Sequence, residues 1–288
     1  MNEYVIFTDS CCDLPREMIA EMGVRVLQLG VTIGGSDTVP NCDVDISDFY
    51  RQLRDKKDAS TSAAPMSDFL EAYEEVLKEG KDIYYIGFSS GLSSTYNWGF
   101  AAAQELSEKY PERTIYTTDT LAASLGQGLL VYYACEKRNS GATLSEVRDY
   151  IESIKLNLCL WFTVDDLFFL KRGGRVSAAT AVVGSMLAIK PVLHMDNAGK
   201  LINVSKVRGR RAAIEALAAK CVETGIDIED QTIFISHGDC EDEAKLLADI
   251  LKTKAGVKKD ILLNHVGPVI GAHSGPGTIA LFFIGTQR

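Results

Sequence analysis

The segment Tyr84 to Leu106, YYIGFSSGLSSTYNWGFAAAQEL, decides the fold of this chain. Its apolar run Tyr84 to Phe88 is typical of a strand, the small residues after it of a tight loop, and Ser94 to Lys109 of a helix. Free backbone N–H groups and the positive end of the helix dipole favour an oxygen anion at such a helix start. One serine would suffice as a helix cap. This loop has five hydroxyl residues, which are Ser89, Ser90, Ser93, Ser94 and Thr95. The segment therefore predicts a site for an acidic ligand group.

The rest of the chain alternates short apolar runs with helix-length segments, which is typical of an α/β fold with helical crossovers between parallel strands. Expected strands are 4–8, 24–33, 83–88, 114–118, 158–164, 191–195, 232–236, 261–266 and 279–285. Expected helices are 66–79, 94–109, 121–138, 210–223 and 241–254. Ligands of such sheets bind beyond the carboxyl ends of the strands. The loops Thr8 to Pro15 and Phe88 to Thr95 should therefore face one crevice.

The length of 288 residues suits two compact domains better than one core. A helix-like run ends near Lys155, and a new series of strands follows it. We expect an N-terminal α/β domain over 1–155, with a largely parallel sheet, and a C-terminal α/β domain over 156–288. The ligand crevice should lie between them.

Composition excludes several classes of function. The chain has 30 Lys and Arg against 39 Asp and Glu, a net charge of −9, so it is a poor match to nucleic acid. Its seven cysteines include no Cys-x-x-Cys pair, which indicates neither a zinc site nor a disulfide framework and fits a reducing cytoplasm. It has no apparent export signal, no apolar run of membrane-spanning length, and no metal or nucleotide motif. We expect a cytoplasmic protein without a cofactor.

Gly87-Phe88-Ser89-Ser90-Gly91 matches the Gly-x-Ser-x-Gly nucleophile elbow and lies at an expected strand-to-helix turn. A serine hydrolase acting on an ester or lipid is therefore the alternative function. Ser89 would be its nucleophile. The acid would be Asp166 or Asp239, and the base His237, His265 or His273. We find no separate glycine-rich loop placed to complete an oxyanion hole.

Further polar residues are candidates for ligand contacts. Thr61 and Ser62 form a second hydroxyl pair, which could face the first across the crevice or simply order a turn. His273 lies between glycine-rich turns and could donate to a ligand oxygen. Basic residues gather at Lys171, Arg172 and Arg175, and again at Lys206, Arg208, Arg210 and Arg211. Each group is either a solvated charge run or a patch for a phosphate group or an acidic partner.

Several motifs occur together in a familiar order. They are TDSCCDLP, TSAAP, SSGLSSTY, DTLAASLGQGLLV, LFFLKRGGRVS, IKPVLHMDNAGKL, KVRGRRAAIEAL, ISHGD and VGPVIGAHSGPGTIALFF. With them the chain resembles the DegV family of bacterial fatty-acid-binding proteins, from Thr8 to about Phe283. The resemblance implies two α/β domains with a long-chain fatty acid buried between them, and no catalytic residue.

The resemblance also implies roles for particular residues. Thr61 and Ser93 would hydrogen-bond the fatty-acid carboxylate, with Ser62, Ser94 and His273 nearby. Arg175 and Arg208 match basic positions that engage a fatty acid kinase or the acyl-phosphate in members that act with one, and Arg172 is a further candidate for that contact. The chain departs from its relatives at TSAAP, where many have a polar residue after Thr-Ser, and at Ser94, where Gly is usual.

The function we expect is a carrier that takes a fatty acid such as palmitate from the membrane and presents it to an ATP-dependent kinase. A lipid sensor would use the same site without the kinase. Burying about fourteen methylenes contributes on the order of 11 kcal/mol, against about 1 kcal/mol for each neutral hydrogen bond. The tail should therefore set the affinity and the head group the orientation. Candidates to surround the tail are Phe168, Phe169, Met186, Leu187, Phe282 and Phe283.

Overall fold

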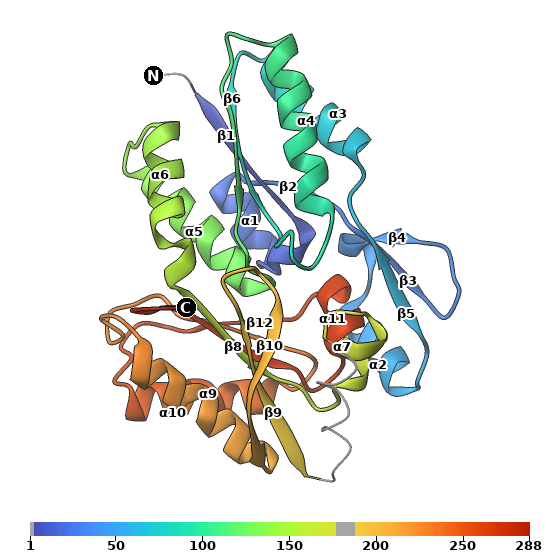
Figure 1. The fold of residues 1–288 in the computed structure, drawn as a ribbon, viewed down its shortest axis with the longest axis vertical. Coiled ribbons are helices and arrows are strands. Elements are labelled where there is room, and N and C mark those ends of the chain that lie inside the picture. The colour runs from blue at the N-terminus through green and yellow to red at the C-terminus, as the bar shows by residue number, and fades with distance from the viewer. Residues whose placement is uncertain (1–2, 177–187) are drawn as a thin grey trace.

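The computed structural model describes residues 3–176 and 188–288, which form three sheets with helices packed around them (Figure 1). The mixture of strands and helices confirms the expected α/β class. The expected Met186 and Leu187 contacts lie outside the described residues.

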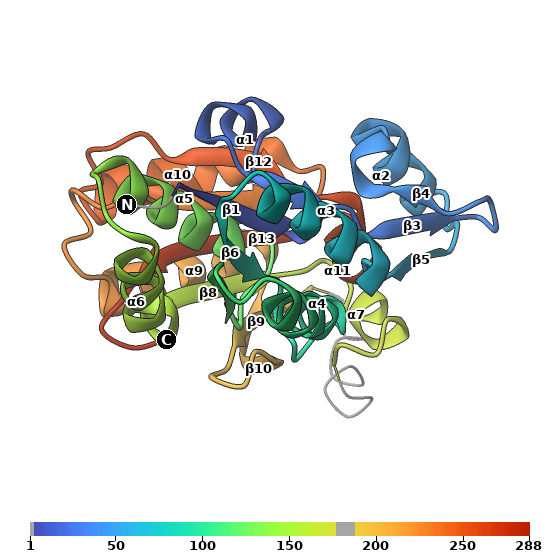
Figure 2. The same cartoon turned by 90° about the horizontal axis from the view of Figure 1, so that it is seen from above.

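The first sheet has the strand order β2-β1-β6-β7, and all its neighbouring strands are parallel, as the sequence predicted. Its strands are β1 Tyr4–Asp9, β2 Arg25–Leu27, β6 Asp82–Gly87 and β7 Ile115–Asp119. Helices α3 and α4 cover one face, and α5 and α6 lie on the other (Figure 2). Their bounds are α3 Met66–Lys78, α4 Thr95–Lys109, α5 Leu125–Asn139 and α6 Leu144–Ile154. The hydroxyl loop therefore connects a central parallel strand to a helix start.

The expected strand 24–33 is divided between two sheets. Its first part is β2, and its second part, β3 Gly30–Ile33, leaves for a small antiparallel sheet with the order β4-β3-β5. Two side chains hold the chain where it passes from the first sheet to the second. The Ser10 hydroxyl accepts from the Leu29 N–H, and the Gln28 amide oxygen accepts from the Cys42 N–H. The remaining elements of this part are η1 Ser10–Cys12, α1 Arg16–Met22, β4 Val39–Pro40, η2 Asn41–Asp43, α2 Ile46–Arg54 and β5 Ala59–Ser62.

The third sheet has six strands in the order β10-β9-β8-β13-β11-β12, antiparallel except for the pair β11 and β12. Its strands are β8 Leu158–Thr163, β9 Ile189–Met195, β10 Leu201–Arg208, β11 Phe234–His237, β12 Leu262–His265 and β13 Ile279–Ile284. The other elements of this half are η3 Lys155–Asn157, α7 Phe168–Arg172, α9 Arg210–Thr224, α10 Glu241–Lys254 and α11 Pro268–Ser274.

Both faces of the central strands β8, β11 and β13 are buried, and successive side chains alternate between them. On β13, Ile279, Leu281 and Phe283 belong to the core beneath α9 and α10. Ala280 and Phe282 belong to the larger core on the opposite face, towards α5 and the parallel sheet. Figure 1 shows α9 and α10 on one side of this sheet and α5 on the other. The side of the sheet that a residue faces is thus fixed by its position along the strand.

The larger core includes residues from both halves of the chain, such as Phe7 and Phe282. The short helix η3 lies at the expected boundary near Lys155. The division into domains 1–155 and 156–288 stays a prediction.

Phe283→Ala should lower the free energy of unfolding by about 3–5 kcal/mol, because Phe283 is fully buried and its loss leaves a cavity beneath α9 and α10. Urea denaturation measures this loss. The control is Phe168→Ala, at a side chain that is 56% exposed, and it should change stability by less than about 1 kcal/mol. Equal losses from the two variants would contradict the assignment of Phe283 to the second core.

Candidate functional site

A cavity of about 280 Å³ lies over the face of the six-stranded sheet that is turned towards the parallel sheet. Small-molecule pockets commonly have roughly 300 to 1,000 Å³, so this one is just below that range. Strand residues that point to this face form its floor, and they are Leu160, Phe162, Ser236, Ala280 and Phe282. In the sheet Phe162 and Ser236 both lie opposite Ala280. The small side chain of Ala280 leaves room between its two neighbours.

Loops from the first half and helix α11 complete the wall. Thr61, Ser62, Ser93, Ser94, Arg175 and His273 all line this cavity. The structure thus brings all five expected carboxylate contacts and one of the three expected arginines to one space. They come from four parts of the fold, namely strand β5, the loop before α4, the segment that follows α7, and helix α11.

A chain of contacts holds these polar groups together. The Thr61 hydroxyl and the His273 Nε2 atom are 2.8 Å apart and share a hydrogen bond. The other ring nitrogen of His273 packs so closely on Gly173 that a Cβ atom there would lie 2.1 Å from it. Arg175 donates to the carbonyl oxygens of Gly173 and Leu92, and Leu92 precedes Ser93. Residue 173 must therefore be glycine for His273 to reach Thr61.

The loop between β6 and α4 is anchored by a buried carboxylate. Asp9 accepts hydrogen bonds from the Tyr85 hydroxyl, the Phe88 N–H and the Cys11 N–H. Burial raises the pKa of Asp9 despite these bonds. Within the loop, the Ser93 hydroxyl oxygen accepts from the Thr95 N–H and shares a hydrogen bond with the Thr95 hydroxyl. Ser93 therefore faces the cavity from a fixed position at the start of α4.

His273 is neutral at physiological pH. Burial lowers its pKa to about 4, and the nearby guanidinium groups of Arg175 and Arg172 act in the same direction. Nδ1 has no hydrogen-bond partner among the described residues, so a proton there would be a buried donor without an acceptor. We infer that the proton lies on Nε2 and is donated to Thr61. The Thr61 hydroxyl proton is then free for a ligand.

The three expected arginines have different surroundings. Helix α7 ends at Arg172, and the left-handed backbone of Gly174, with φ of 72°, turns the chain so that Arg175 lines the cavity. Arg172 instead forms an ion pair with Asp58 at 2.5 Å. Arg208 is exposed at the end of β10. Among the described residues that line the cavity, Arg175 is the only permanently charged one.

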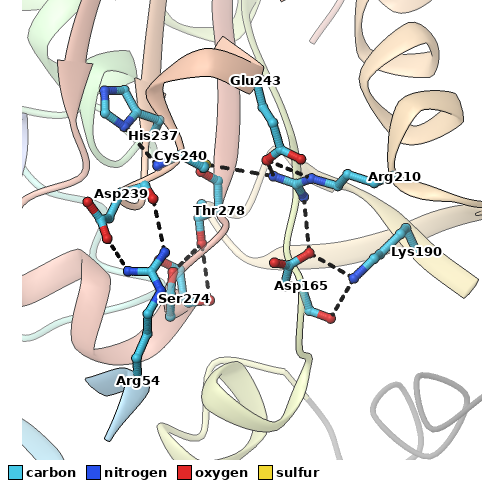
Figure 3. Close-up of polar contacts among 11 residues, drawn as sticks. Arg54, Asp165, Lys190, Arg210, His237, Asp239, Cys240, Glu243, Ser274 and Thr278 are labelled. Carbon is cyan, nitrogen blue, oxygen red and sulfur yellow. Dashed lines mark hydrogen bonds and ion pairs between the residues drawn. The ribbon is translucent and has the colours of Figure 1, made fainter. Parts of the chain in front are cut away.

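The second basic group of the sequence is not one patch. Figure 3 shows Arg210 between the carboxylates of Glu243 and Asp165, and Asp165 also pairs with Lys190. Arg211 is on the exposed side of α9 and pairs with Glu215. Arg210 is therefore occupied in a structural network, while Arg208 remains at the surface.

The geometry gives no support to the hydrolase alternative. Ser89 is fully buried, and its hydroxyl donates to the Gly199 carbonyl oxygen at 2.8 Å. Its hydrogen bonds within the described part of the chain involve no imidazole. The suggested partners are engaged elsewhere, since Asp239 pairs with Arg54 (Figure 3), Asp166 accepts from the Phe168 N–H, and His273 bonds Thr61.

The expected tail contacts are only partly placed at the cavity. Phe282 forms part of the floor. Phe283 does not, because adjacent residues of a strand face opposite sides and Phe283 belongs to the second core. Phe168 is exposed, and Phe169 packs on Gly275 and beneath the Arg172 guanidinium. Of the candidates to surround the tail that lie in the described residues, Phe282 lines the cavity and Phe283, Phe168 and Phe169 do not.

Four hydroxyl residues of the lining were missed by the sequence analysis, and they are Ser124, Ser236, Ser274 and Thr278. Thr278 donates to the carbonyl oxygens of Ser274 and Gly275, as Figure 3 shows for Ser274. The Ser274 hydroxyl is buried and lacks a partner within the described ranges. Ser236 could have been found from strand alternation, since it lies two positions from the core residue Phe234.

Within residues 3–176 and 188–288, no group of three or more His, Cys, Asp or Glu side chains is arranged to hold a metal ion. The helices of these same ranges include none with both the length and the apolar character required to cross a bilayer.

Comparison with known proteins identifies relatives over nearly the whole chain. Residues 3–286 match the model of the DegV family. A DegV domain-containing protein of Clostridium perfringens is 44% identical, covering 100% of this chain and 99% of that protein. A fatty-acid-binding DegV family protein from Thermus thermophilus is 30% identical with a TM-score of 0.87, covering 99% of this chain and 100% of that one. DegV of Bacillus subtilis, a fatty acid binding protein, is 26% identical with a TM-score of 0.82 and the same coverage.

His273 should make the protein sensitive to acid. The folded state keeps its imidazole neutral down to about pH 4, whereas the unfolded chain binds a proton near its ordinary pKa of about 6.5. The unfolded state therefore binds more protons between these values, and stability falls as the pH falls through this window. In His273→Gln, which has no imidazole, the acid-induced decrease in the free energy of unfolding should be about 1–3 kcal/mol smaller than in wild type. Urea denaturation at a series of pH values measures the difference. Superimposable pH profiles for the two proteins would contradict the neutral, buried imidazole.

Proposed function

This chain belongs to the DegV family, and from that premise we propose that it binds a long-chain fatty acid in the cavity over the six-stranded sheet. Thr61 and Ser93 would hydrogen-bond the carboxylate, with Ser62, Ser94 and His273 close by. The hydrocarbon would extend over Ala280, Phe282 and Phe162. The observation that carries the proposal is one cavity that joins this apolar floor to the hydroxyl cluster.

The hydroxyl protons available at this cluster suit a carboxylate ligand. An ionised carboxylate only accepts hydrogen bonds, so it needs donors. His273 donates to Thr61, which leaves the Thr61 proton for the ligand. Ser93 accepts from the Thr95 N–H, and with the Thr95 hydroxyl as the donor in the bond between the two hydroxyls, the Ser93 proton is also available to the ligand. Two hydroxyl donors would thus meet the two carboxylate oxygens.

Arg175 supplies the positive charge near this head group. Its guanidinium is half-buried, and burial lowers its pKa, but an arginine side chain stays protonated in proteins. It is already bonded to two backbone carbonyl oxygens, which fixes its position. We infer that it stabilises the bound carboxylate at medium range.

The finer role that we propose is that of a carrier. The protein would take a fatty acid such as palmitate by transient membrane contact, hold it in the cytoplasm, and present its carboxylate to an ATP-dependent fatty acid kinase for acyl-phosphate formation. The exposed Arg208 would contribute to the contact with the kinase, with Arg172, which pairs with Asp58, as a second candidate. This chain would supply binding and orientation, and the kinase would supply the chemistry.

Ser93→Ala should weaken fatty-acid binding by about 10- to 100-fold, because a hydrogen bond to a charged group contributes about 1.5–3 kcal/mol. The measurement is the dissociation constant of a long-chain fatty acid, together with native mass spectrometry of the lipid that copurifies. The matched control is Ser90→Ala, in the same loop but exposed and outside the cavity lining. Unchanged affinity and unchanged copurifying lipid in Ser93→Ala would overturn the proposal.

Arg208→Ala should leave fatty-acid affinity unchanged but reduce acyl-phosphate formation at least about tenfold when a fatty acid kinase and ATP are added, because an exposed cation contributes to docking. The rate of acyl-phosphate formation is measured at saturating fatty acid. Arg211→Ala is the control, since Arg211 is also exposed and basic but pairs with Glu215. Equal rates for wild type and Arg208→Ala would contradict the kinase contact without affecting the binding proposal.

A further inference from the structure

A second polar group interrupts the apolar wall of the cavity. Ser124, which immediately precedes α5, and Ser236, on β11, both line it. Their hydroxyl oxygens are 3.0 Å apart, and the Ser124 hydroxyl donates to an oxygen of Asp13 at 2.5 Å. All three residues are more than nine-tenths buried, with exposed fractions of 4%, 0% and 8%. We call Asp13, Ser124 and Ser236 the serine-aspartate relay.

The relay lies away from the head-group cluster. Asp13 bonds the backbone of Gly267, which precedes α11, whereas His273 is near the end of that helix. Six residues of helix rise on the order of 9 Å. The two polar groups are thus separated by almost two helical turns, and apolar residues of α11, Val269 and Ile270, line the cavity between them.

The backbone is strained where it forms the relay. Asp13 and Ser124 both have positive φ angles, of 52° and 53°. Residues other than glycine rarely adopt such values unless the surrounding structure imposes them. Neither strand pairing nor a side-chain helix cap accounts for the Ser124 hydroxyl, since α5 has no side-chain cap hydrogen bond.

The available protons give the relay a direction. The Asp13 carboxylate accepts from the Gly267 N–H and from Ser124, which uses the only hydroxyl proton of Ser124. Ser236 must therefore donate to Ser124 in the bond between them. Its own proton is then used as well. What the relay presents to the cavity is a set of oxygen lone pairs, which can accept a hydrogen bond but cannot donate one.

We propose that the serine-aspartate relay is a second subsite, which accepts a hydrogen bond from a hydroxyl group along the acyl chain, so that the cavity favours hydroxylated fatty acids. This inference rests on the proposed function, because it places a fatty-acid chain in the same cavity. A ketone at the same carbon has a similar size but offers no proton, so it leaves its own oxygen and the serine oxygen unpaired.

The test compares octadecanoic acid with its mid-chain hydroxy and keto derivatives, by dissociation constants at about pH 9. Burial raises the pKa of Asp13 to about 7, so the carboxylate is ionised there. Wild type should bind the hydroxy acid about three- to tenfold more tightly than the keto acid, which is the range expected for one hydrogen bond. Moving the hydroxyl to the carbon next to the carboxyl group should abolish the preference.

Two variants test the direction of the relay. Ser236→Ala removes the acceptor and should bring the ratio of hydroxy to keto affinity to about one. In Asp13→Asn the amide oxygen would accept from Gly267 and the amide nitrogen would donate to Ser124, which reverses every proton in the relay. That variant should prefer the keto acid.

Ser93→Ala serves as the control for the head group, and it should weaken all three ligands by a similar factor without changing their ratio. A ratio near one in wild type, with tight binding of all three acids, would overturn this inference and leave the proposed function intact. The same holds if the ratio persists in Ser236→Ala. Failure of every acid to bind wild type would instead overturn the proposed function.

Discussion

The six-stranded sheet must bury both of its faces, and the rest of the molecule is arranged to meet that requirement. Helices α9 and α10 cover one face with a dry core that includes Leu281 and Phe283. Among the described elements, α5 packs on the other face, against β8, β11 and β13. Residues of α11 and of loops from the parallel sheet line the cavity that lies above Ala280 on this face. An apolar ligand there would complete a core that the protein itself leaves open.

The same arrangement explains why the polar groups of the site come from distant parts of the sequence. Strand β5 supplies Thr61 and helix α11 supplies His273, residues that are 212 positions apart in the chain and joined by one hydrogen bond. The bond depends on Gly173, because any larger residue there would displace the imidazole. A site of this kind is preorganised before a ligand arrives, which lowers the ordering cost of binding.

Much of the fold could be predicted from the sequence, because the parallel sheet follows from alternating apolar runs and helix-length segments. Ser93 and Thr61 could be named from a loop rich in hydroxyl residues and from a family resemblance. Phe282 and Phe283 show the limit, since both are apolar residues of one strand and only the register decides which faces the cavity. Arg175 and Arg172 show the same limit of prediction from sequence, because the turn at Gly174 gives these two nearby arginines different surroundings.

The Gly-x-Ser-x-Gly match shows that a sequence motif indicates a function only where the structure places its residues in the arrangement that the function requires. Ser89 occupies the right position in the sequence, but its side chain is committed to the Gly199 carbonyl group, in the turn between β9 and β10. That partner is 110 residues away, and no local pattern indicates it. Ser124 was missed for the same reason, since it is a single serine whose role depends on tertiary contacts, whereas strand alternation could have placed Ser236 on the cavity face.

The central claim is that one cavity holds a carboxylate at its hydroxyl cluster and a hydrocarbon chain over the sheet. A crystal structure of the protein with bound octadecanoic acid tests it most directly. The account predicts a carboxylate within hydrogen-bond distance of the Thr61 and Ser93 hydroxyl groups, and a chain in contact with Ala280 and Phe282. A carboxylate bound elsewhere, or a chain outside this cavity, would contradict it.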